Sequence, residues 1–202
     1  MGLLASRVGV PELLCVLRPS LPSTLETPET EPDDSFVDCL IRPITLEDTH
    51  FLWEMLYEAI YVAEGVKPPA RDVLLQPDIR RYLQDWGQPH DSGFVALDPV
   101  TSNRIGAVWL RLLIGDQKGY GYVNDATPEL TIAVIPECRG KGVGTRLLSH
   151  LLRTTESRYP SLSLSVSPDN PALRLYNRLG FERVGSSGTS LVMKRGSQSP
   201  RP

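Results

Sequence analysis

The stretch RGKGVGTRLL at residues 139–148 places three glycines at alternate positions, between a short apolar run and a leucine-rich segment. Glycine inside a helix or strand costs roughly 0.5–1 kcal/mol relative to alanine, so three glycines this close together need a physical reason. One reason is a tight loop that requires unusual backbone angles. The other is close approach of backbone N–H groups to a bound anion at the positive end of a helix dipole. In both cases a strand must end here, and a helix must begin after a sharp turn.

Hydrophobic periodicity divides the rest of the chain into further elements. The predicted strands cover residues 39–45, 92–98, 104–113, 129–135, 161–167, 181–185 and 189–195. The predicted helices cover residues 46–65, 76–87, 143–152 and 170–180. Consecutive strands favour antiparallel pairing, whereas the two strand–helix–strand passages require parallel pairing with right-handed crossovers. The sequence therefore predicts an α/β (α+β) chain, with a mixed sheet and helices on its faces.

Composition predicts one folded domain at residues 38–195, because 202 residues are too few for two domains with sizeable cores. Residues 1–37 are acidic and rich in Pro, Ser and Thr, and we expect them to be a disordered tail. We expect the same of residues 196–202. Residues 38–202 hold 19 basic and 18 acidic residues, a balance that does not favour a nucleic-acid partner.

Other compositional features restrict the compartment and the partners. No apolar run approaches the ~20 residues of a membrane-spanning helix, so we expect no membrane partner. The three cysteines have neither paired nor metal-ligand spacing, and the three histidines are scattered. These patterns predict a reducing, cytoplasmic location and no metal site.

The glycine stretch does not fit the common nucleotide-binding fingerprints. A P-loop needs Ser or Thr after its lysine, but Gly142 follows Lys141, and a dinucleotide fingerprint needs glycine where Thr145 stands. The stretch does fit R/Q-x-x-G-x-G/A, with Arg139, Gly142 and Gly144. Together with the downstream segment LSLSVSPDNPALRLYNRLGF, it resembles the GNAT superfamily of acetyl-CoA-dependent N-acetyltransferases. The resemblance is specific over residues 129–181, and the order of elements agrees with the family from about residue 39 to residue 195.

The resemblance implies a GNAT-like sheet of about seven strands, centrally parallel and flanked by about four helices. It also implies acetyl-CoA as co-substrate, with its pyrophosphate at the first, unpaired N–H groups of the helix after the glycines. Positive charge on Arg139 and Lys141 would assist this binding. A tight turn without any ligand is the alternative. The residues implied in cofactor binding are Ile132, Ala133, Val134, Arg139, Gly140, Lys141, Gly142, Val143, Gly144, Thr145, Asn170 and Tyr176.

Two residues are candidates for acid–base catalysis. The resemblance implies that Tyr176 protonates the departing thiolate, whereas its helical position alone is equally that of a core tyrosine. Ribosomal-protein Nα-acetyltransferases carry a glutamate where this chain has Ser165, so the candidate base is Glu129, with Asp125 in reserve. A strand-start carboxylate bonded to a neighbouring loop is the alternative for Glu129. Backbone N–H groups near Val134 and Ile135 are candidate donors to the oxyanion. Asn170 is a helix cap that, by resemblance, also contacts the cofactor.

The acceptor is expected to be a primary amine on a small molecule, peptide or protein. By resemblance the first helix walls its site, where Trp53 and Tyr57 would suit a cationic amine, with Asp125 nearby. A solvated acidic helix face explains Glu54 and Glu58 equally well. Residues 115–128 are long enough to form a lid. The alternative to an enzyme is a catalytically silent CoA-binding sensor or interaction module. In either case we expect a monomer or a homodimer.

Overall fold

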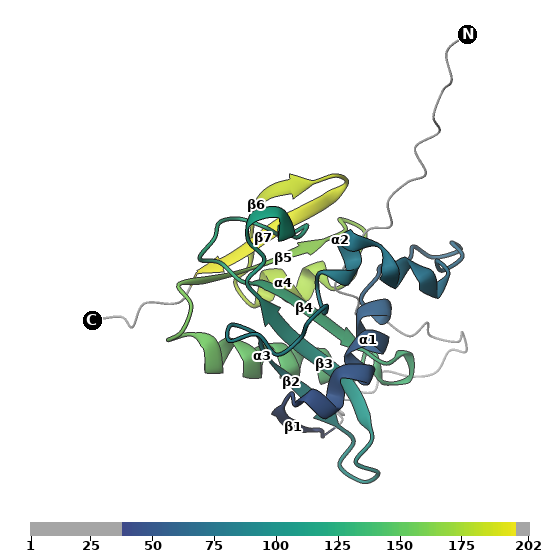
Figure 1. Ribbon diagram of the computed structural model, residues 1–202. Coiled ribbons are helices and arrows are strands. Elements are labelled where there is room, and N and C mark those ends of the chain that lie inside the picture. Colours follow the sequence, from purple (N-terminus) through teal and green to yellow (C-terminus); the bar gives the residue numbers. More distant parts are fainter. Residues whose placement is uncertain (1–37, 197–202) are drawn as a thin grey trace, which may run out of the picture.

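A computed structural model describes residues 38–196, which form one sheet of seven strands with helices on both faces (Figure 1). The strand order is β1-β2-β3-β4-β5-β7-β6. The strands are β1 Leu40–Pro43, β2 Ser92–Leu97, β3 Arg104–Arg111, β4 Glu129–Val134, β5 Ser161–Val166, β6 Glu182–Ser187 and β7 Ser190–Gly196. The seven-stranded mixed sheet confirms the predicted fold class. The predictions for residues 1–37 and 197–202 lie outside the described residues.

The sheet is antiparallel except at its centre. β1 to β4 pair antiparallel in chain order, and β4 pairs with β5 in parallel after a crossover through α3 (Val143–Thr155). The first predicted parallel passage is therefore confirmed. The second is wrong, because β7 lies between β5 and β6 and pairs antiparallel with both. Burial explains this order, since β7 is largely buried whereas β6 is largely exposed, and an edge position suits the more exposed strand.

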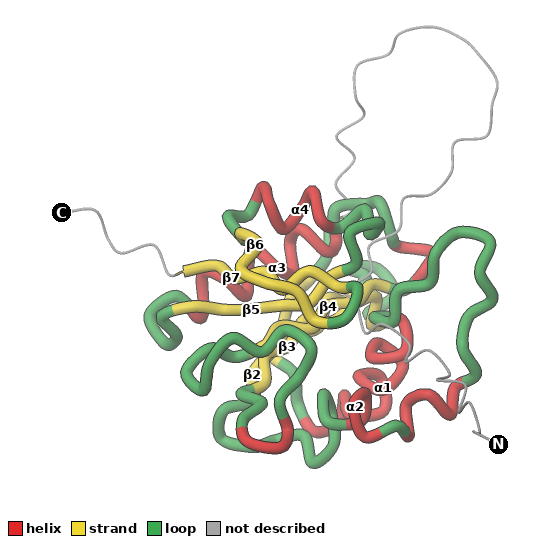
Figure 2. The backbone as a smooth tube through the Cα atoms, turned by 90° about the horizontal axis from the view of Figure 1, so that it is seen from above, coloured by secondary structure: helices red, strands yellow, loops and turns green. Residues whose placement is uncertain are grey.

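Helices cover the two faces of the sheet as separate pairs, α1 with α2 and α3 with α4 (Figure 2). These helices are α1 Thr49–Glu58, α2 Pro77–Arg80, α3 Val143–Thr155 and α4 Leu173–Arg178. Side chains of β4 alternate between the two cores. Leu130, Ile132 and Val134 pack with α3 and α4, whereas Ala133 packs with α1 and α2. Since alternate residues share a face, Glu129 lies on the α1–α2 side.

The first two helices are shorter than the periodicity predicts. Residues 46–48 form a 3₁₀ turn and α1 ends at Glu58, so the predicted helix 46–65 is wrong at both ends. α2 covers four residues of the predicted 76–87. Beyond α2 the chain continues in turns, in which the Leu83 and Gln84 N–H groups both donate to the Arg80 carbonyl, at 3.0 and 2.8 Å. The Arg111 side chain of β3 donates to the carbonyls of Arg81 and Gln84 and joins this segment to the sheet.

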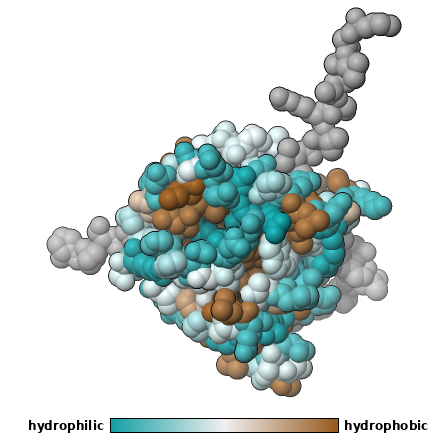
Figure 3. Space-filling view, viewed as in Figure 1, coloured by the Kyte–Doolittle hydropathy of each residue, from teal (hydrophilic) through white to brown (hydrophobic). Residues whose placement is uncertain are grey.

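Apolar side chains are scattered over the face of the molecule that Figure 3 shows. Figure 3 shows a mostly hydrophilic face with apolar groups in separate places. The exposed large hydrophobic side chains also come from different segments, and they are Leu40, Leu46, Val66, Leu75, Val100, Ile114 and Val184. Within residues 38–196, no helix is both long and apolar enough to cross a bilayer.

A buried carboxylate fixes the start of α1 against the sheet. Asp48 is fully buried and pairs with Arg42 of β1 and Arg104 of β3, each at 2.7 Å. Its carboxylate also accepts the Thr45 backbone N–H at 2.9 Å and so completes a capping box with Thr45. The hydrogen bonds from Arg42 are the main cause that holds the pKa of Asp48 well below its usual range.

We expect Asp48→Asn to lower the free energy of unfolding by about 2 kcal/mol at pH 7, because two guanidinium groups lose their common partner. A lowered pKa stabilises the fold above the ordinary aspartate value of 3.8, and this stabilisation is lost as the pH falls toward the lowered pKa. The difference between variant and wild type should therefore shrink in acid. Urea unfolding at pH 7 and pH 3 measures it, with Glu47→Gln as the exposed neighbouring control. Equal stability of Asp48→Asn and wild type at pH 7 would contradict the anchoring role.

Candidate active site

The glycine stretch forms a left-handed turn that opens α3. Gly140 and Gly142 have φ angles of +74° and +80°, a region that residues with a Cβ rarely adopt. The first intrahelical bond runs from the Arg146 N–H to the Gly142 carbonyl, at 3.0 Å. The N–H groups of Val143, Gly144 and Thr145 therefore precede any helical acceptor. The turn explains two of the glycines, and it also presents backbone donors at the positive end of α3.

The Arg139 side chain turns back toward α1. Its Nε donates to the Val134 carbonyl at 2.9 Å, and its guanidinium forms an ion pair with Glu58. Its charge is thus directed at the end of α1, and a contribution of Arg139 to phosphate binding stays a prediction. Lys141 is the exposed cation of the loop.

β4 and β5 separate immediately after they meet. Their parallel register contains one pair, Glu129 with Ser163, although each strand is six residues long. The Ile135 N–H donates to the Ile105 carbonyl at 3.0 Å, so the prediction that Ile135 is an oxyanion donor is wrong. Because successive N–H groups of a strand point to opposite sides, those of Val134 and Ile132 point toward β5. The opening between the two strands therefore has backbone donors along the β4 side.

Glu129 is a buried carboxyl group with one bonded and one unbonded oxygen. Its Oε1 accepts the Tyr82 hydroxyl at 2.6 Å and the Gly121 N–H at 2.7 Å. Its Oε2 is buried and has no hydrogen-bond partner among the described residues. Burial raises the pKa of Glu129 to about 7, against the lowering effect of these hydrogen bonds and of the Arg81 charge. The Gly121 contact fits the alternative interpretation, a strand-start carboxylate bonded to a neighbouring loop, and a role of Glu129 as base stays a prediction.

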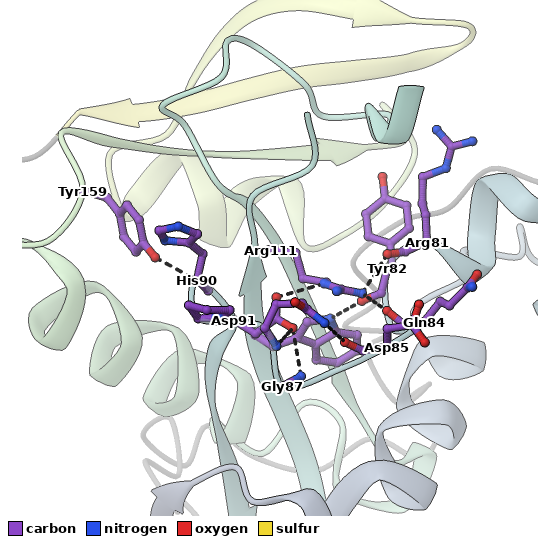
Figure 4. A network of polar contacts seen from close by, with 12 residues as sticks. Arg81, Tyr82, Gln84, Asp85, Gly87, His90, Asp91, Arg111 and Tyr159 are labelled. Atoms are coloured by element: carbon purple, nitrogen blue, oxygen red, sulfur yellow. Dashed lines mark hydrogen bonds and ion pairs between the residues drawn. The ribbon is translucent and has the colours of Figure 1, made fainter. Parts of the chain in front are cut away.

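Tyr82 is a site residue that sequence reasoning missed. It is 1% exposed, and its carbonyl accepts the Trp109 Nε1–H at 3.1 Å. The Arg111 side chain fixes the neighbouring backbone, and Asp91 in turn holds Arg111 at 3.0 Å (Figure 4). Tyr82 stands 47 residues before Glu129, and its helical spacing predicts only a core residue. No local pattern could have identified the contact.

Tyr176 and Asn170 lie on α4 and the turn before it. Tyr176 is fully buried, with its ring edge-on to Phe181 at 6.0 Å, in the core shared with α3. It therefore lies on the opposite face of the sheet from Glu129. The Asn170 Oδ1 accepts the Ala172 N–H at 2.9 Å, so Asn170 caps the turn that leads into α4, although α4 itself begins at Leu173. The two candidate catalytic residues, Tyr176 and Glu129, thus lie on opposite faces of the sheet.

The position of Ser165 bears on the question of the base. Ser163 is paired with Glu129, and Ser165 follows two residues later, so both point to the same face as Glu129. Their hydroxyl oxygens are buried without a hydrogen-bond partner among the described residues. A carboxylate at position 129 therefore lies on the same face as one at position 165 would.

The residues predicted to bind the acceptor are less buried than Glu129 and Tyr176. Trp53 and Tyr57 are half-buried on α1, and the Tyr57 hydroxyl donates to the Pro69 carbonyl at 2.7 Å. Tyr57 and Glu58 of α1 line a cavity of about 140 Å³, and Arg139 of the glycine loop lines the same cavity. Asp125 is exposed and accepts the Tyr122 hydroxyl at 2.8 Å, so it lacks the burial of Glu129.

The buried Glu129 should make stability depend on pH. Its pKa is raised from 4.5 to about 7, so the neutral form favours folding at low pH, and this advantage is lost as the pH rises through about 7. Glu129→Gln removes the ionisation. We expect this variant to gain roughly 2 to 3 kcal/mol over wild type between pH 5 and pH 8. This gain equals a melting-temperature difference on the order of 5–10 °C.

Scanning calorimetry across this pH range measures the difference. The exposed Glu137→Gln is the matched control and should follow wild type at every pH. A constant offset between Glu129→Gln and wild type would contradict the raised pKa.

Part of the sequence is similar to known acetyltransferases. The N-alpha-acetyltransferase RimI of Mycobacterium tuberculosis (strain ATCC 25618 / H37Rv) is 39% identical over 79 residues, which are 35% of this chain and 49% of that protein. The 5-NmdU N-acetyltransferase of Pseudomonas phage PaMx11 is 40% identical over 57 residues, or 28% of this chain and 39% of that protein. The chain thus spans less than half the length of these curated relatives.

Solved structures share the fold over most of the chain. The ribosomal-protein-S18-alanine N-acetyltransferase from Escherichia coli has a TM-score of 0.55 at 17% identity, and the match covers 81% of this chain and 97% of that one. The PaiA N-acetyltransferase from Thermoplasma acidophilum, in complex with coenzyme A, has a TM-score of 0.53 at 19% identity, with 79% and 99% covered. At such identities the likeness establishes the fold alone.

A profile of the acetyltransferase (GNAT) family matches residues 53–181, more than half of the chain. The matched range takes in the second part of α1, the diverging strands, the glycine loop and α4. The chain belongs to the acetyltransferase (GNAT) family.

Proposed function

We propose that the protein is an N-acetyltransferase that moves the acetyl group of acetyl-CoA directly to a primary amine. One observation carries the proposal: a buried carboxyl group, Glu129, has an unbonded oxygen and stands where β4 and β5 separate. Family membership supports the reaction class, and the glycine turn at α3 supports the co-substrate. A cytoplasmic location and a monomeric or homodimeric state belong to the same proposal.

The residues around the opening fit coenzyme A. Backbone N–H groups at the start of α3 would hold the pyrophosphate, with Lys141 beside them and Asn170 across the opening. The N–H groups of Ile132 and Val134 would hold the acyl-bearing arm. When bound, acetyl-CoA supplies an activated acetyl group and a thiol leaving group.

Distances along β4 favour one of its N–H groups as the donor to the oxyanion. Ile132 is three residues from Glu129, about 10 Å along the strand, whereas Val134 is about 17 Å away. One bridging water joins groups about 5 to 6 Å apart. The Glu129 side chain and one or two waters thus span the shorter distance but not the longer one. We infer that the Ile132 N–H is the oxyanion donor. The Val134 N–H would bind the same arm of acetyl-CoA at a point further from the thioester.

Glu129 has the ionisation that a general base needs. A base works best when its pKa lies near the working pH, and burial raises that of Glu129 to about 7. In the proposed step, Glu129 takes a proton from the ammonium form of the acceptor through water. Its place on the face of Ser165 accounts for catalysis without a glutamate on β5. On the opposite face, Tyr176 would donate its proton to the departing thiolate.

A silent CoA-binding module is the second candidate, because Glu129 is only 4% exposed. A screen of acceptors, monitored by release of free thiol from acetyl-CoA, separates the two functions. The panel should contain peptides with free N-termini, polyamines, amino acids and aminoglycosides. Turnover that falls sharply in Glu129→Gln supports the enzyme. Tight acetyl-CoA binding without turnover on any acceptor would favour the module.

A pair of substitutions at Gly142 tests the phosphate site. Asn and Asp both tolerate a positive φ, so Gly142→Asn and Gly142→Asp differ mainly in charge. We expect Gly142→Asp to bind acetyl-CoA at least ~10-fold more weakly than Gly142→Asn, because a carboxylate repels the pyrophosphate. The same carboxylate interacts favourably with the helix dipole, so its melting temperature should be equal or higher. Calorimetric titration and thermal melts measure both, and equal affinities would contradict the site.

We expect Tyr176→Phe to lower kcat by ~10²-fold or more and to leave KM for acetyl-CoA nearly unchanged. The hydroxyl would act only as the C–S bond breaks, so ground-state binding should not depend on it. Steady-state kinetics by thiol release measures both constants. A full kcat in Tyr176→Phe would mean that the tyrosine is structural and that the thiolate leaves without its help.

A further inference from the structure

A glycine-tyrosine-glycine segment, residues 119–121, lies directly on Glu129, and we call it the strap. A Cβ added to Gly119 would lie 2.2 Å from the Glu129 Oε2, and one added to Gly121 would lie 2.7 Å from its Oε1. The Gly121 Cβ would also lie 2.7 Å from the carbonyl carbon of Leu164 in β5. Since real Cβ atoms do not approach so closely, both glycines are needed for this contact. The strap therefore closes over the carboxyl group and reaches across to β5.

One hydroxyl group joins the strap to the carboxyl group. The Tyr82 hydroxyl donates to the Glu129 Oε1 at 2.6 Å and accepts the Tyr120 N–H at 2.8 Å. A phenol has one proton to donate and lone pairs to accept, so both bonds form at the same time. The Gly121 N–H donates to the same Oε1 at 2.7 Å and completes a ring of contacts.

The two partners of this hydroxyl differ in how firmly they are held. The Tyr82 backbone is fixed to β3, because Trp109 bonds its carbonyl and Arg111 bonds the carbonyls on either side of it (Figure 4). Arg111 is itself paired with Asp91. The strap belongs to the irregular connection between β3 and β4, outside every strand and helix. Tyr82 is thus a fixed point, to which the strap is attached by its backbone.

We propose that Tyr82 is a positioning residue that orients the Glu129 carboxyl group and latches the strap over it, so that the strap must lift before an acceptor amine reaches Glu129. The catalytic meaning of the latch rests on the proposed function. Its structural claim does not, because every contact involved lies within the chain itself.

Removing the Tyr82 hydroxyl distinguishes a latch from a simple hydrogen bond. Loss of a hydrogen bond alone would raise the pKa of Glu129, whereas opening of the strap would lower it. The titratable and charged groups that face Glu129 are Arg81, Tyr82, Arg111 and Tyr120. The Tyr82 hydrogen bond lowers the pKa of Glu129, and burial raises it. If the strap stays closed in Tyr82→Phe, the lost hydrogen bond raises the pKa further. If the strap opens, water reaches the carboxylate and the pKa falls.

The experiment is a carbon-13 NMR titration of the glutamate carboxyl groups in the protein without acetyl-CoA, with Glu129→Gln to assign the signal. The latch predicts that Tyr82→Phe lowers the pKa of Glu129 from about 7 toward the ordinary 4.5. Gly119→Ala should do the same, because its Cβ keeps the strap from closing. The control is Gly115→Asn, on the same connection with φ +60° and nothing within 4 Å of its Cβ, and it should titrate like wild type. A pKa that rises or stays the same in Tyr82→Phe would overturn the proposal.

Amide hydrogen exchange gives a second reading on the same proteins. The Tyr120 and Gly121 N–H groups are hydrogen-bonded only when the strap is closed, so their exchange should be at least ~10-fold faster in Tyr82→Phe. Exchange in β3 should not change, which also shows that the variant is folded. Unchanged exchange at Tyr120 and Gly121 would contradict the latch. If the latch holds but no acceptor releases thiol, the proposed function fails and the latch stands.

Discussion

A single parallel pairing, Glu129 with Ser163, is the constraint on which the site depends. It joins the antiparallel strands β1–β4 to the group β5–β7–β6, and the two central strands separate directly after it. The separation leaves N–H groups of β4 pointing into an opening, which α3 closes at its N-terminus with the glycine turn. A fully paired β5 would use those donors in the ladder, and no arm of a ligand could lie between the strands. The same pairing sets Glu129 beside the opening, on the face away from Tyr176.

The burial of Glu129 links stability to reactivity. A carboxyl group in a dry environment resists ionisation, and this resistance gives it a pKa near neutrality. The ionised form lowers the stability of the fold, as is common for groups that an active site keeps reactive. In the proposed latch, the strap and Tyr82 maintain this burial, and access of water to the carboxyl group sets the basicity of Glu129. Asp48 shows the contrasting case, since two arginines satisfy a buried carboxylate that serves only to hold α1 in place.

Local patterns carried most of what the sequence could predict. The glycine turn, the helix after it and the apolar alternation of the strands depend on neighbours along the chain, and the structure confirms them. The errors are non-local. The order of β6 and β7 follows from comparing the burial of two strands. The turned-back Arg139 and the occupied Ile135 N–H both follow from contacts with distant elements. Tyr82 was invisible for the same reason.

The most direct test of the account is a crystal structure of the protein with acetyl-CoA. The account predicts the pyrophosphate on the N–H groups that open α3, and the thioester oxygen within hydrogen-bonding distance of the Ile132 N–H. One or two ordered waters should lead from the space beside the acetyl carbon, where the acceptor amine would stand, to the Glu129 Oε2. A thioester bound elsewhere, or one whose path to Glu129 is blocked by packed side chains, would contradict the role of Glu129 as the base.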